Sequence, residues 1–330
     1  MQQILSFGEI LIRQQSQGLS FFGSDSNLLE IFPGGSEANV AASLALMGNS
    51  VAYMTAMPEN ALSTGVIHVL QQHKVDTRKI IFTGDRIGSY LLLSADGLTK
   101  GEVIYDRKYS SFSQLKISEL PLAEILEGVS WLHWTALSPA LNQDMANLME
   151  ALLQAAQDRN IPISVDLNYR NKLWQYGKEP IEVMPKLVQY CTVIMGNIWA
   201  ANKMLGIGLD ANLDRYTSKE NYLQAAANSA QEIFKAYPNC KHLAYTFRFM
   251  DNPQHNLFYG TYHCPGQDLH SETFETNQLL DRIGSGDAFM AGFIHALVRN
   301  LSPQEIIDTA TGAGFQKLFV RGDFGNGKIK

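Results

Sequence analysis

The sequence predicts an α/β protein with a three-layer core: a mostly parallel β-sheet between two layers of helices, with a small β-sheet lid attached. Two observations favour this fold class. Short apolar segments rich in β-branched or aromatic residues alternate with longer amphipathic segments along most of the 330 residues, as strands and crossover helices do. Near residue 79 this alternation gives way to successive short strands, which indicates an inserted hairpin.

The first half of the chain supplies the beginning of the core and the lid. Its core elements are strands at Ile4–Ile12 and Val51–Ala56 and helices at Ala38–Met47 and Ala61–Lys74. The lid follows as strands at Ile80–Thr83, Tyr90–Ser94 and Val103–Asp106, linked by Gly-Asp and Ala-Asp-Gly turn sequences. The aromatic, turn-rich residues Phe21–Phe32 are expected to join it, so that the lid comprises about residues 13–33 and 79–113.

The second half returns to the alternating pattern. The expected strands are Trp131–Thr135, Pro162–Asp166, Thr192–Met195, Leu243–Phe247 and Leu257–His263, and the expected helices are Asn142–Asp158, Glu182–Tyr190, Ser218–Ala236, one from Gly286 and one near Pro303. The chain contains no repeat, low-complexity tract or linker sequence. We therefore expect residues 1–330 to form a single domain with the lid inserted in its core.

Composition narrows the class of partner. A net charge of −6 offers no basic surface for nucleic acid or an anionic membrane, so a small molecule is the expected partner. Cys191, Cys240 and Cys264 are widely spaced and odd in number, which predicts neither a disulfide framework nor a zinc site and fits a reducing cytoplasm. No basic leader and no apolar run of roughly 18 residues is present, so neither export nor a membrane span is expected.

The segment Asp281-Arg282-Ile283-Gly284-Ser285-Gly286-Asp287 carries the strongest chemical signal. Two glycines and a carboxylate lie where an apolar helix begins. Backbone N–H groups of Gly284, Ser285 and Gly286 and the positive end of the helix dipole could hold a phosphoryl group, and Asp287 could accept a proton from an attacking hydroxyl. Taken alone, the same residues also fit a tight turn with Asp287 as a helix cap. Neither a Walker A loop nor a dinucleotide fingerprint occurs.

A second segment, Gly34-Gly35-Ser36-Glu37-Ala38-Asn39, favours the catalytic interpretation. Together the two segments closely resemble the paired signatures of the ribokinase-like (PfkB) carbohydrate kinases, in the expected order and about 250 residues apart. The resemblance implies the ribokinase-like fold, ATP as phosphoryl donor, and Asp287 as the base. Gly34 and Gly35 would let the backbone approach a small polyol closely, and Asn39 would offer a donor and an acceptor to a sugar hydroxyl.

Finer features resemble the 2-keto-3-deoxygluconate kinases within that family. They are Phe7–Arg13, Ile104-Tyr105-Asp106-Arg107, Ser111–Ser113, Asp166–Arg170 with Lys172–Trp174, Asp281-Arg282 and Gly322-Asp323-Phe324. A sugar acid carries a carboxylate, which guanidinium groups recognise with two parallel hydrogen bonds. The resemblance therefore implies substrate contacts from Arg107 and Arg170, with hydroxyls from Tyr90 and Tyr105. Without the resemblance, a solvated or salt-bridged surface group is the better explanation of each arginine.

The nucleotide side is implied less completely. Asn168 and Asn197 follow core strands, where ligands bind in open α/β sheets, and are expected to contact nucleotide or phosphate; a turn-forming role is the alternative for both. Thr246 and Arg248 match the nucleotide-side segment. Ala200 departs from the family pattern Asn-x-x-Glu, in which the acid helps to organise the metal. Mg²⁺ is still expected on the nucleotide phosphates, with its protein ligand unknown.

These inferences give one expected function and two alternatives. The expected function is ATP-dependent phosphorylation of the terminal hydroxyl of 2-keto-3-deoxygluconate. The alternatives are a kinase of the same family acting on fructose, ribose or a nucleoside, and a non-catalytic sugar or nucleotide sensor, which the missing acid at Ala200 keeps open. Because an open sheet in water invites pairing, a homodimer through the lid is also expected.

Overall fold

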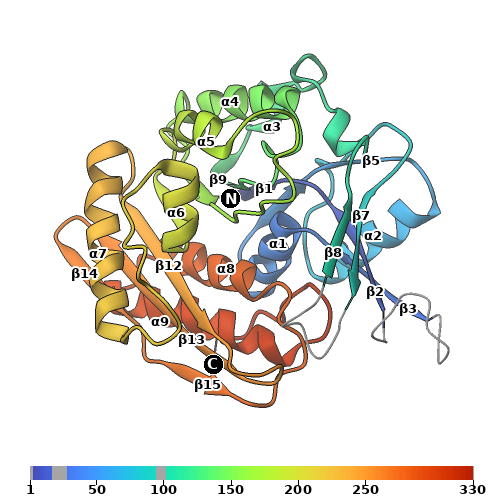
Figure 1. Ribbon diagram of the computed structural model, residues 1–330. Coiled ribbons are helices and arrows are strands. Elements are labelled where there is room, and N and C mark those ends of the chain that lie inside the picture. Colours follow the sequence, from blue (N-terminus) through green and yellow to red (C-terminus); the bar gives the residue numbers. More distant parts are fainter. Residues whose placement is uncertain (1–2, 17–27, 94–101, 330) are drawn as a thin grey trace.

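The computed structural model describes residues 3–16, 28–93 and 102–329, and Figure 1 shows a large twisted sheet with helices on both faces and a smaller sheet at one side. Within the described residues the large sheet has nine strands, ordered β14-β13-β12-β11-β10-β9-β1-β4, with β15 paired to β13. Its strands are β1 (Gln3–Phe7), β4 (Val51–Met54), β9 (Val129–Thr135), β10 (Ile163–Asp166), β11 (Val193–Gly196), β12 (His242–Phe249), β13 (Asn256–Cys264), β14 (Gln267–His270) and β15 (Phe274–Thr276).

From β4 to β12 all neighbouring strands are parallel, whereas β13, β14 and β15 add an antiparallel edge. The parallel strands are connected by helices, as such strands must be. As a result, the carboxyl ends of β10, β11 and β12 meet at one edge of the sheet. Ligands of open α/β sheets bind at such an edge.

The helices divide into two layers. They are α1 (Ser36–Leu46), α2 (Ala61–Gln72), α3 (Leu122–Ile125), α4 (Gln143–Gln157), α5 (Pro180–Val188), α6 (Ile198–Leu205), α7 (Lys219–Ala236), α8 (Ser285–Val298) and α9 (Pro303–Gln316). One buried cluster packs the helices α3, α4, α5, α6 and α7 against one face of the large sheet. A second cluster packs α1, α2, α8 and α9 against the other face. The three-layer core predicted from the alternating pattern is confirmed.

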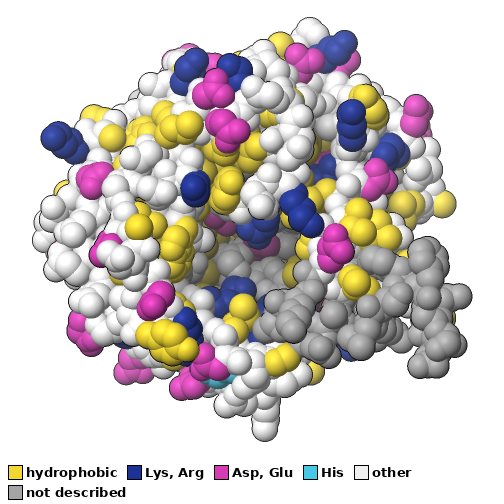
Figure 2. Space-filling model, viewed as in Figure 1, with side chains coloured by type: hydrophobic (Ala, Val, Ile, Leu, Met, Phe, Trp, Pro, Cys, Tyr) yellow, Lys and Arg dark blue, Asp and Glu magenta, His cyan; other side chains and the backbone are white. Residues whose placement is uncertain are grey.

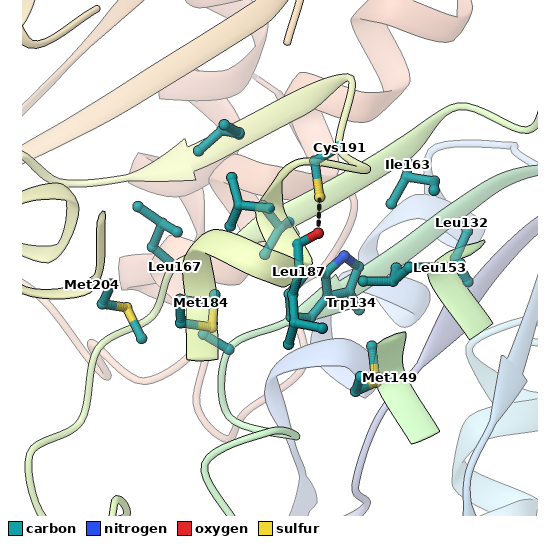
Figure 3. Packing of buried hydrophobic residues seen from close by; sticks show 14 of the residues in the cluster. Leu132, Trp134, Met149, Leu153, Ile163, Leu167, Met184, Leu187, Cys191 and Met204 are labelled. Atoms are coloured by element: carbon teal, nitrogen blue, oxygen red, sulfur yellow. Dashed lines mark hydrogen bonds between the residues drawn. The ribbon is translucent and has the colours of Figure 1, made fainter. Parts of the chain in front are cut away.

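Figure 3 shows part of the first cluster, in which the fully buried Trp134 of β9 lies beside Leu153 of α4 and Leu187 of α5. Cys191 is buried here, with Sγ 3.9 Å from the Leu187 carbonyl oxygen. Cys191, Cys240 and Cys264 are free cysteines. Among the described helices, none combines the length and apolar character that a membrane crossing requires.

The smaller sheet has the order β3-β2-β7-β8, from β2 (Leu11–Ser16), β3 (Leu29–Gly34), β7 (Gly88–Leu93) and β8 (Glu102–Asp106). We call it the lid sheet. Its register places Phe32, Arg13, Tyr90 and Tyr105 in one cross-strand row. The adjacent row contains Ile31, Gln14, Leu91 and Ile104. Because side chains alternate between faces along a strand, these rows lie on opposite faces of the lid sheet.

Three predicted strands differ from the structure. The segment Ile4–Ile12 is wrong as a single strand, because β1 ends at Phe7 and β2 belongs to the lid sheet. Gly8 lies between the two strands, where a Cβ would be 2.0 Å from Glu37 Cδ, so no larger residue fits beside that side chain. Val51–Ala56 is also split, and Ile80–Thr83 is not a lid strand: β6 (Ile81–Phe82) pairs with β5 (Ala56–Met57) in a separate two-stranded sheet.

Other predictions are incomplete rather than wrong. Helix α6 and strands β14 and β15 were not expected, because each is too short for a periodic pattern to reveal it. Of the residues Phe21–Phe32, the structure describes the last five, and β3 does pair within the lid sheet. Residues 17–27 of the predicted lid, and Ser94 at the end of the predicted strand Tyr90–Ser94, lie outside the described residues.

Candidate active site

A cavity of about 540 Å³ opens at the carboxyl edge of the large sheet, between the start of α8 and the lid sheet. Figure 2 shows a hollow in the middle of the molecule with Lys and Arg atoms inside it. The lid sheet contributes the face that carries Tyr90 and Tyr105, and β10, β11 and β12 contribute the residues at or just beyond their ends. The two sheets therefore enclose one site from opposite sides.

Asp287 lies at the bottom of this cavity, in the first turn of α8. Ser36 Oγ donates to its Oδ1 over 2.6 Å, and Asn39 Nδ2 donates to its Oδ2 over 2.7 Å. Burial raises the pKa of the carboxyl, and these two hydrogen bonds partly oppose that shift. The cap of α8 is Gly284, with no side-chain capping bond. Asp287 is thus held from α1 as a potential proton acceptor and does not act as a helix cap.

Two glycines of the site, Gly284 and Gly35, have backbone conformations and close contacts that a larger residue could not accommodate. Gly284 has φ +80°, and a Cβ there would lie 2.2 Å from the Asp323 carbonyl oxygen. Gly35 has φ +118°, and a Cβ would lie 2.3 Å from the Glu9 carbonyl oxygen. Both values fall in the left-handed region that glycine adopts easily. The first amides of a helix have no acceptor within the helix itself. In α8, the amide of Ser285 donates to the carbonyl oxygen of Arg282, which precedes the helix, over 3.3 Å.

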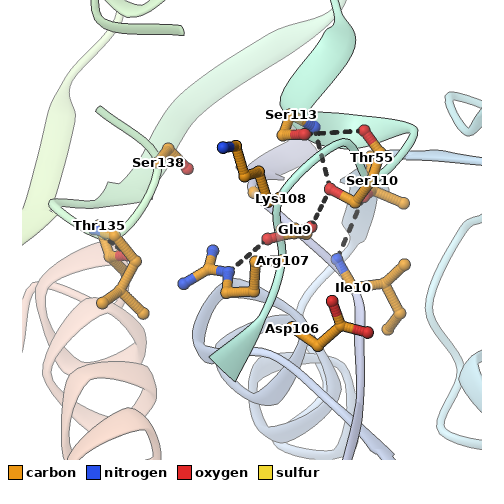
Figure 4. A network of polar contacts seen from close by, with 12 residues as sticks. Glu9, Ile10, Thr55, Asp106, Arg107, Lys108, Ser110, Ser113, Thr135 and Ser138 are labelled. Carbon is orange, nitrogen blue, oxygen red and sulfur yellow. Dashed lines mark hydrogen bonds and ion pairs between the residues drawn. The ribbon is translucent and has the colours of Figure 1, made fainter. Parts of the chain in front are cut away.

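Arg107 projects into the cavity from the end of β8 and is held by Glu9 (Figure 4). Its Nε lies 2.5 Å from Glu9 Oε2, and Ser110 Oγ donates to Glu9 Oε1. Both members of the pair are almost fully buried, at 4% and 1% exposure. Arg107 Nη1 is buried without a hydrogen-bond partner, within the part of the chain that is described. One face of the guanidinium is therefore fixed by the protein and another remains for a ligand.

Arg170 approaches the same cavity from the loop after β10 and is exposed. Its Nη1 donates to the Tyr169 carbonyl oxygen over 2.9 Å, and its charge acts on both Asp166 and Asp287. Asn168, on the same loop, has φ +29° and donates through Nδ2 to Ser36 Oγ over 3.0 Å. The loop thus continues the hydrogen-bond chain that ends on Asp287.

The nucleotide-side candidates line the other end of the cavity. Asn197 has the turn-type role that its sequence context left open: its Oδ1 accepts from the Ala200 amide over 2.8 Å and caps α6. Thr246 Oγ1 donates to the Gly196 carbonyl oxygen over 3.3 Å, and Arg248 Nη2 donates to Ser285 Oγ. Burial, together with the charges of Arg282 and Arg170, lowers the pKa of Arg248 to about 10.

A buried ionic cluster fastens the lid sheet to the Asp287 loop. Arg13 of β2 pairs with two carboxylates: its Nη2 lies 2.8 Å from Asp281 Oδ2, and its Nε lies 2.9 Å from Asp323 Oδ2. Its guanidinium carbon lies 4.3 Å from the centre of the Phe32 ring. Tyr90 Oη donates to Asp323 Oδ1 over 3.1 Å. Burial raises the pKa of Asp323 to about 6, although Arg13 opposes that shift. Segments from both ends of the chain therefore meet beneath the cavity.

Comparison with known proteins decides the family. Residues 1–323 match the pfkB family of carbohydrate kinases. The chain belongs to that family. It is thus a carbohydrate kinase, and the fold class predicted from the paired motifs is confirmed.

Three relatives show how far the likeness extends. A 2-dehydro-3-deoxygluconokinase of Thermotoga maritima has a solved structure that superposes with a TM-score of 0.88 at 29% identity, covering 98% of this chain and 96% of that one. The 2-dehydro-3-deoxygluconokinase of Bacillus subtilis is 24% identical over 88% of this chain and 81% of its own length. A 2-dehydro-3-deoxygalactonokinase of Haloferax volcanii is 29% identical over 52% of this chain, and the match spans about half, 54%, of that kinase.

Most candidate residues of the kinase line the one cavity, and one does not. Those lining it are Gly35, Asn39, Tyr90, Tyr105, Arg107, Asn168, Arg170, Asn197, Thr246, Arg248, Gly284, Ser285, Gly286 and Asp287. Gly34 instead lies against Asp323, whose Oδ1 would be 2.2 Å from a Cβ at that position. Its role is to admit the Asp323 side chain, which in turn contacts Tyr90.

Sequence reasoning did not assign Ser36, Asp166, Arg282 or Asp323, all of which line the cavity. Ser36 adjoins Gly35, and Asp166 ends a predicted strand, so position in the chain could have indicated both. Asp166 is buried, and burial followed by the charge of Asp287 raises its pKa to about 7. Nothing in the local sequence shows that Arg282 and Asp323 meet the site, because tertiary packing brings them there.

The side chains of the cavity suit a metal ion that is coordinated mainly by nucleotide phosphates better than one coordinated by protein ligands alone. In the described part of the kinase, no three or more His, Cys, Asp or Glu side chains are grouped so that they could hold a metal ion. Ala200 of α6 is buried, and its methyl side chain has no atom that could coordinate a metal ion. Asp166 remains as a carboxylate in the cavity, and one or two carboxylates suffice for Mg²⁺ that keeps its waters and phosphate ligands.

Proposed function

We propose that this kinase transfers the γ-phosphoryl group of ATP to the terminal hydroxyl of 2-keto-3-deoxygluconate, giving 2-keto-3-deoxy-6-phosphogluconate and ADP. The observation that carries the proposal is the presence of Asp287 and two arginines, Arg107 and Arg170, in one cavity. A guanidinium forms charge-assisted hydrogen bonds with a sugar carboxylate that a neutral sugar cannot offer. The relatives named above as 2-dehydro-3-deoxygluconokinases support the same substrate.

The sugar acid would lie beneath the lid sheet. Its carboxylate accepts from Arg107 Nη1, which is buried without a partner among the described residues, and from the guanidinium of Arg170, with Tyr90 and Tyr105 beside it. Asn39 Oδ1 is buried without a hydrogen-bond partner in the described structure, so it can accept from a sugar hydroxyl while Nδ2 keeps its bond to Asp287. These contacts direct the far end of the substrate towards Asp287.

Asp287 then accepts the proton of the terminal hydroxyl, and that oxygen attacks the γ-phosphorus as the bond to ADP breaks. The raised pKa of Asp287 brings its basicity nearer to neutral pH, where a base is most effective. Amides at the start of α8 face the phosphoryl oxygens, and the helix dipole favours negative charge there. Mg²⁺, carried on the phosphates with Asp166 as a candidate ligand, would neutralise charge that develops on the nucleotide.

A coupled ADP-release assay tests the substrate. The panel is 2-keto-3-deoxygluconate, 2-keto-3-deoxygalactonate, fructose, ribose and adenosine, and we expect the first to give the highest kcat/KM. Asp287→Asn should lower kcat by about 10²–10⁴-fold with little change in sugar binding. Wild-type turnover in this variant would remove Asp287 from the mechanism.

A second comparison isolates the carboxylate. Arg170→Met should lower kcat/KM for the acid by about tenfold or more, because a charge-assisted hydrogen bond contributes about 1.5–3 kcal/mol, and it should hardly affect a neutral sugar. Arg159→Met is the matched control, since Arg159 also donates through Nη1 to a backbone carbonyl but lies at the end of α4. Equal losses for acid and neutral sugars would favour the neutral-sugar alternative.

The outer face of the lid sheet supports the proposal of a homodimer. Leu29, Ile31 and Ile104 are 40%, 63% and 44% exposed there, and the register aligns Ile31 and Ile104 in one row. Burying such a row against a second copy would remove apolar surface from water. Light scattering should give the mass of a dimer, and Ile31→Lys with Ile104→Lys should give a monomer. Leu62→Lys, at a 51% exposed site on α2, is the control. A wild-type monomer at assay concentration contradicts this proposal.

A further inference from the structure

Arg248, near the end of β12, is a cation in the cavity wall, and no carboxylate of the described residues pairs with it. It lies in the wall next to the Asp287 loop, where its Nη2 donates to Ser285 Oγ, and its guanidinium carbon lies 5.9 Å from the Phe258 ring centre. Within the described residues no carboxylate lies at ion-pair distance from it, and its Nε is buried without a hydrogen-bond partner. A guanidinium in this setting lacks the counter-charge that partly buried arginines usually have.

The electrostatic surroundings of Arg248 are unfavourable in the ligand-free protein. Burial, with the charges of Arg282 of the Asp287 loop and Arg170 of the loop after β10, lowers its pKa to about 10. Asp287, on α8, acts in the opposite direction. The guanidinium of Arg248 thus experiences the charges of two other arginines and of one opposing carboxylate. Such an arrangement is costly unless an anion binds among them.

Arg215 provides a useful contrast, because it also places a guanidinium beside an aromatic ring. Its guanidinium carbon lies 5.3 Å from the Phe249 ring centre, but its Nη2 lies 2.7 Å from Asp251 Oδ1 and it does not line the cavity. Of these two ring-packed arginines, Arg215 is paired with a carboxylate, whereas Arg248, for which the described residues provide no ion pair, lines the cavity.

We propose that Arg248 is a catalytic residue that contacts the transferred phosphoryl group. This inference rests on the proposed kinase reaction at the same site. Nη2 of Arg248 already donates to Ser285 Oγ. The remaining N–H groups of the guanidinium can therefore donate to phosphoryl oxygens held at the start of α8. In the transfer, the bond from the sugar oxygen to phosphorus forms, the bond to ADP breaks with its electron pair leaving on ADP, and the sugar proton goes to Asp287. Arg248 stays protonated throughout and stabilises the negative charge on the phosphoryl oxygens.

The first experiment measures anion binding without turnover. Thermal unfolding of wild type, Arg248→Met and Arg215→Met is followed with and without sodium tripolyphosphate, at constant ionic strength. We expect tripolyphosphate to raise Tm of wild type and of Arg215→Met and to leave Arg248→Met unshifted. Because Met retains the apolar stem and removes an uncompensated charge, Arg248→Met alone should unfold at or above the wild-type Tm. A lower Tm with an unchanged tripolyphosphate shift would show a structural role and overturn the proposal. So would the absence of any shift in wild type.

The second experiment measures the chemical step. With ATP and the best sugar of the panel, Arg248→Met should lower kcat about 10²–10³-fold with a smaller change in the KM of ATP, as expected for a group that acts most strongly in the transition state. Arg248→Lys, which keeps a charge but loses the fork of donors, should recover part of the loss. A normal kcat in Arg248→Met contradicts the catalytic role even if the kinase reaction itself is confirmed.

The two experiments also separate this inference from the proposed substrate. If wild type phosphorylates no sugar of the panel and tripolyphosphate still binds through Arg248, the substrate is wrong and the anion contact stands. If wild type phosphorylates 2-keto-3-deoxygluconate and Arg248→Met does so equally well, the proposed substrate is confirmed and the proposed catalytic role of Arg248 is wrong.

Discussion

The ion pair between Glu9 and Arg107 makes a testable contribution to both stability and substrate binding. Glu9→Gln keeps the size and one acceptor oxygen of the side chain and removes its charge. Arg107, 4% exposed, would then be a buried cation without a counter-ion. The same change frees the guanidinium from the oxygen that orients it, so Nη1 would no longer be directed into the cavity. We expect losses in both properties from this one substitution.

The size of the stability loss follows from burial. Removing one member of a buried ion pair costs about 3–5 kcal/mol, and the retained amide oxygen of Gln places the expected value near the lower end, about 3 kcal/mol. With an unfolding entropy of about 2.1 cal/mol/K per residue, a chain of 330 residues loses roughly 4 °C of Tm for this free energy. A substrate carboxylate that loses an oriented charge-assisted bond should bind about tenfold or more weakly.

Calorimetry and the coupled assay measure the two effects. Asp106→Asn is the matched control, because the pair between Asp106, which adjoins Arg107, and Arg86 has a similar separation of 2.6 Å but side chains that are 54% and 36% exposed. That control should cost less than about 1 kcal/mol. The double variant Glu9→Gln with Arg107→Met should be more stable than Glu9→Gln alone, since it removes the stranded charge. Equal Tm changes in Glu9→Gln and Asp106→Asn, or a double variant less stable than Glu9→Gln, would refute this reasoning.

Three further predictions concern the frame around Asp287. Gly284→Ala should cost at least about 1–2 kcal/mol for left-handed backbone and abolish most turnover, because its Cβ would lie 2.2 Å from the Asp323 carbonyl oxygen; normal kcat and Tm would contradict this. Arg13→Met should lower the free energy of unfolding by about 3–5 kcal/mol in urea titration, since it strands Asp281 and Asp323; a loss below about 1 kcal/mol would show that the cluster is not an ionic support. Burial raises the pKa of Glu37 from 4.5 to about 7. The folded state thus binds this proton more tightly than the unfolded state, and the associated stability is lost as pH rises from about 4.5 through 7. Glu37→Gln should therefore raise Tm, relative to wild type, more at pH 8 than at pH 5, and a pH-independent difference would exclude that titration.

The alternating pattern of the sequence was sufficient for the layers of the core, because helix and strand periods record which side chains are buried. It was insufficient at Gly8 and at Ala56. There the chain changes sheets within an apolar run, and periodicity cannot show which sheet a strand joins. The same limit hid α6, whose eight residues make little more than two turns.

For the site, the sequence by itself determined the two glycine segments, Asp287 and the family to which they belong, because close backbone approach and a helix start need particular residues at fixed spacing. Only the tertiary structure decided what surrounds them. It placed Ser36 and Asn39 on the carboxylate of Asp287, paired Arg107 with Glu9, and gave Arg248 no carboxylate partner among residues 3–16, 28–93 and 102–329. Hydrogen bonds and ion pairs between residues about 100 to 250 positions apart depend on packing of whole layers, and no local pattern of residues encodes them.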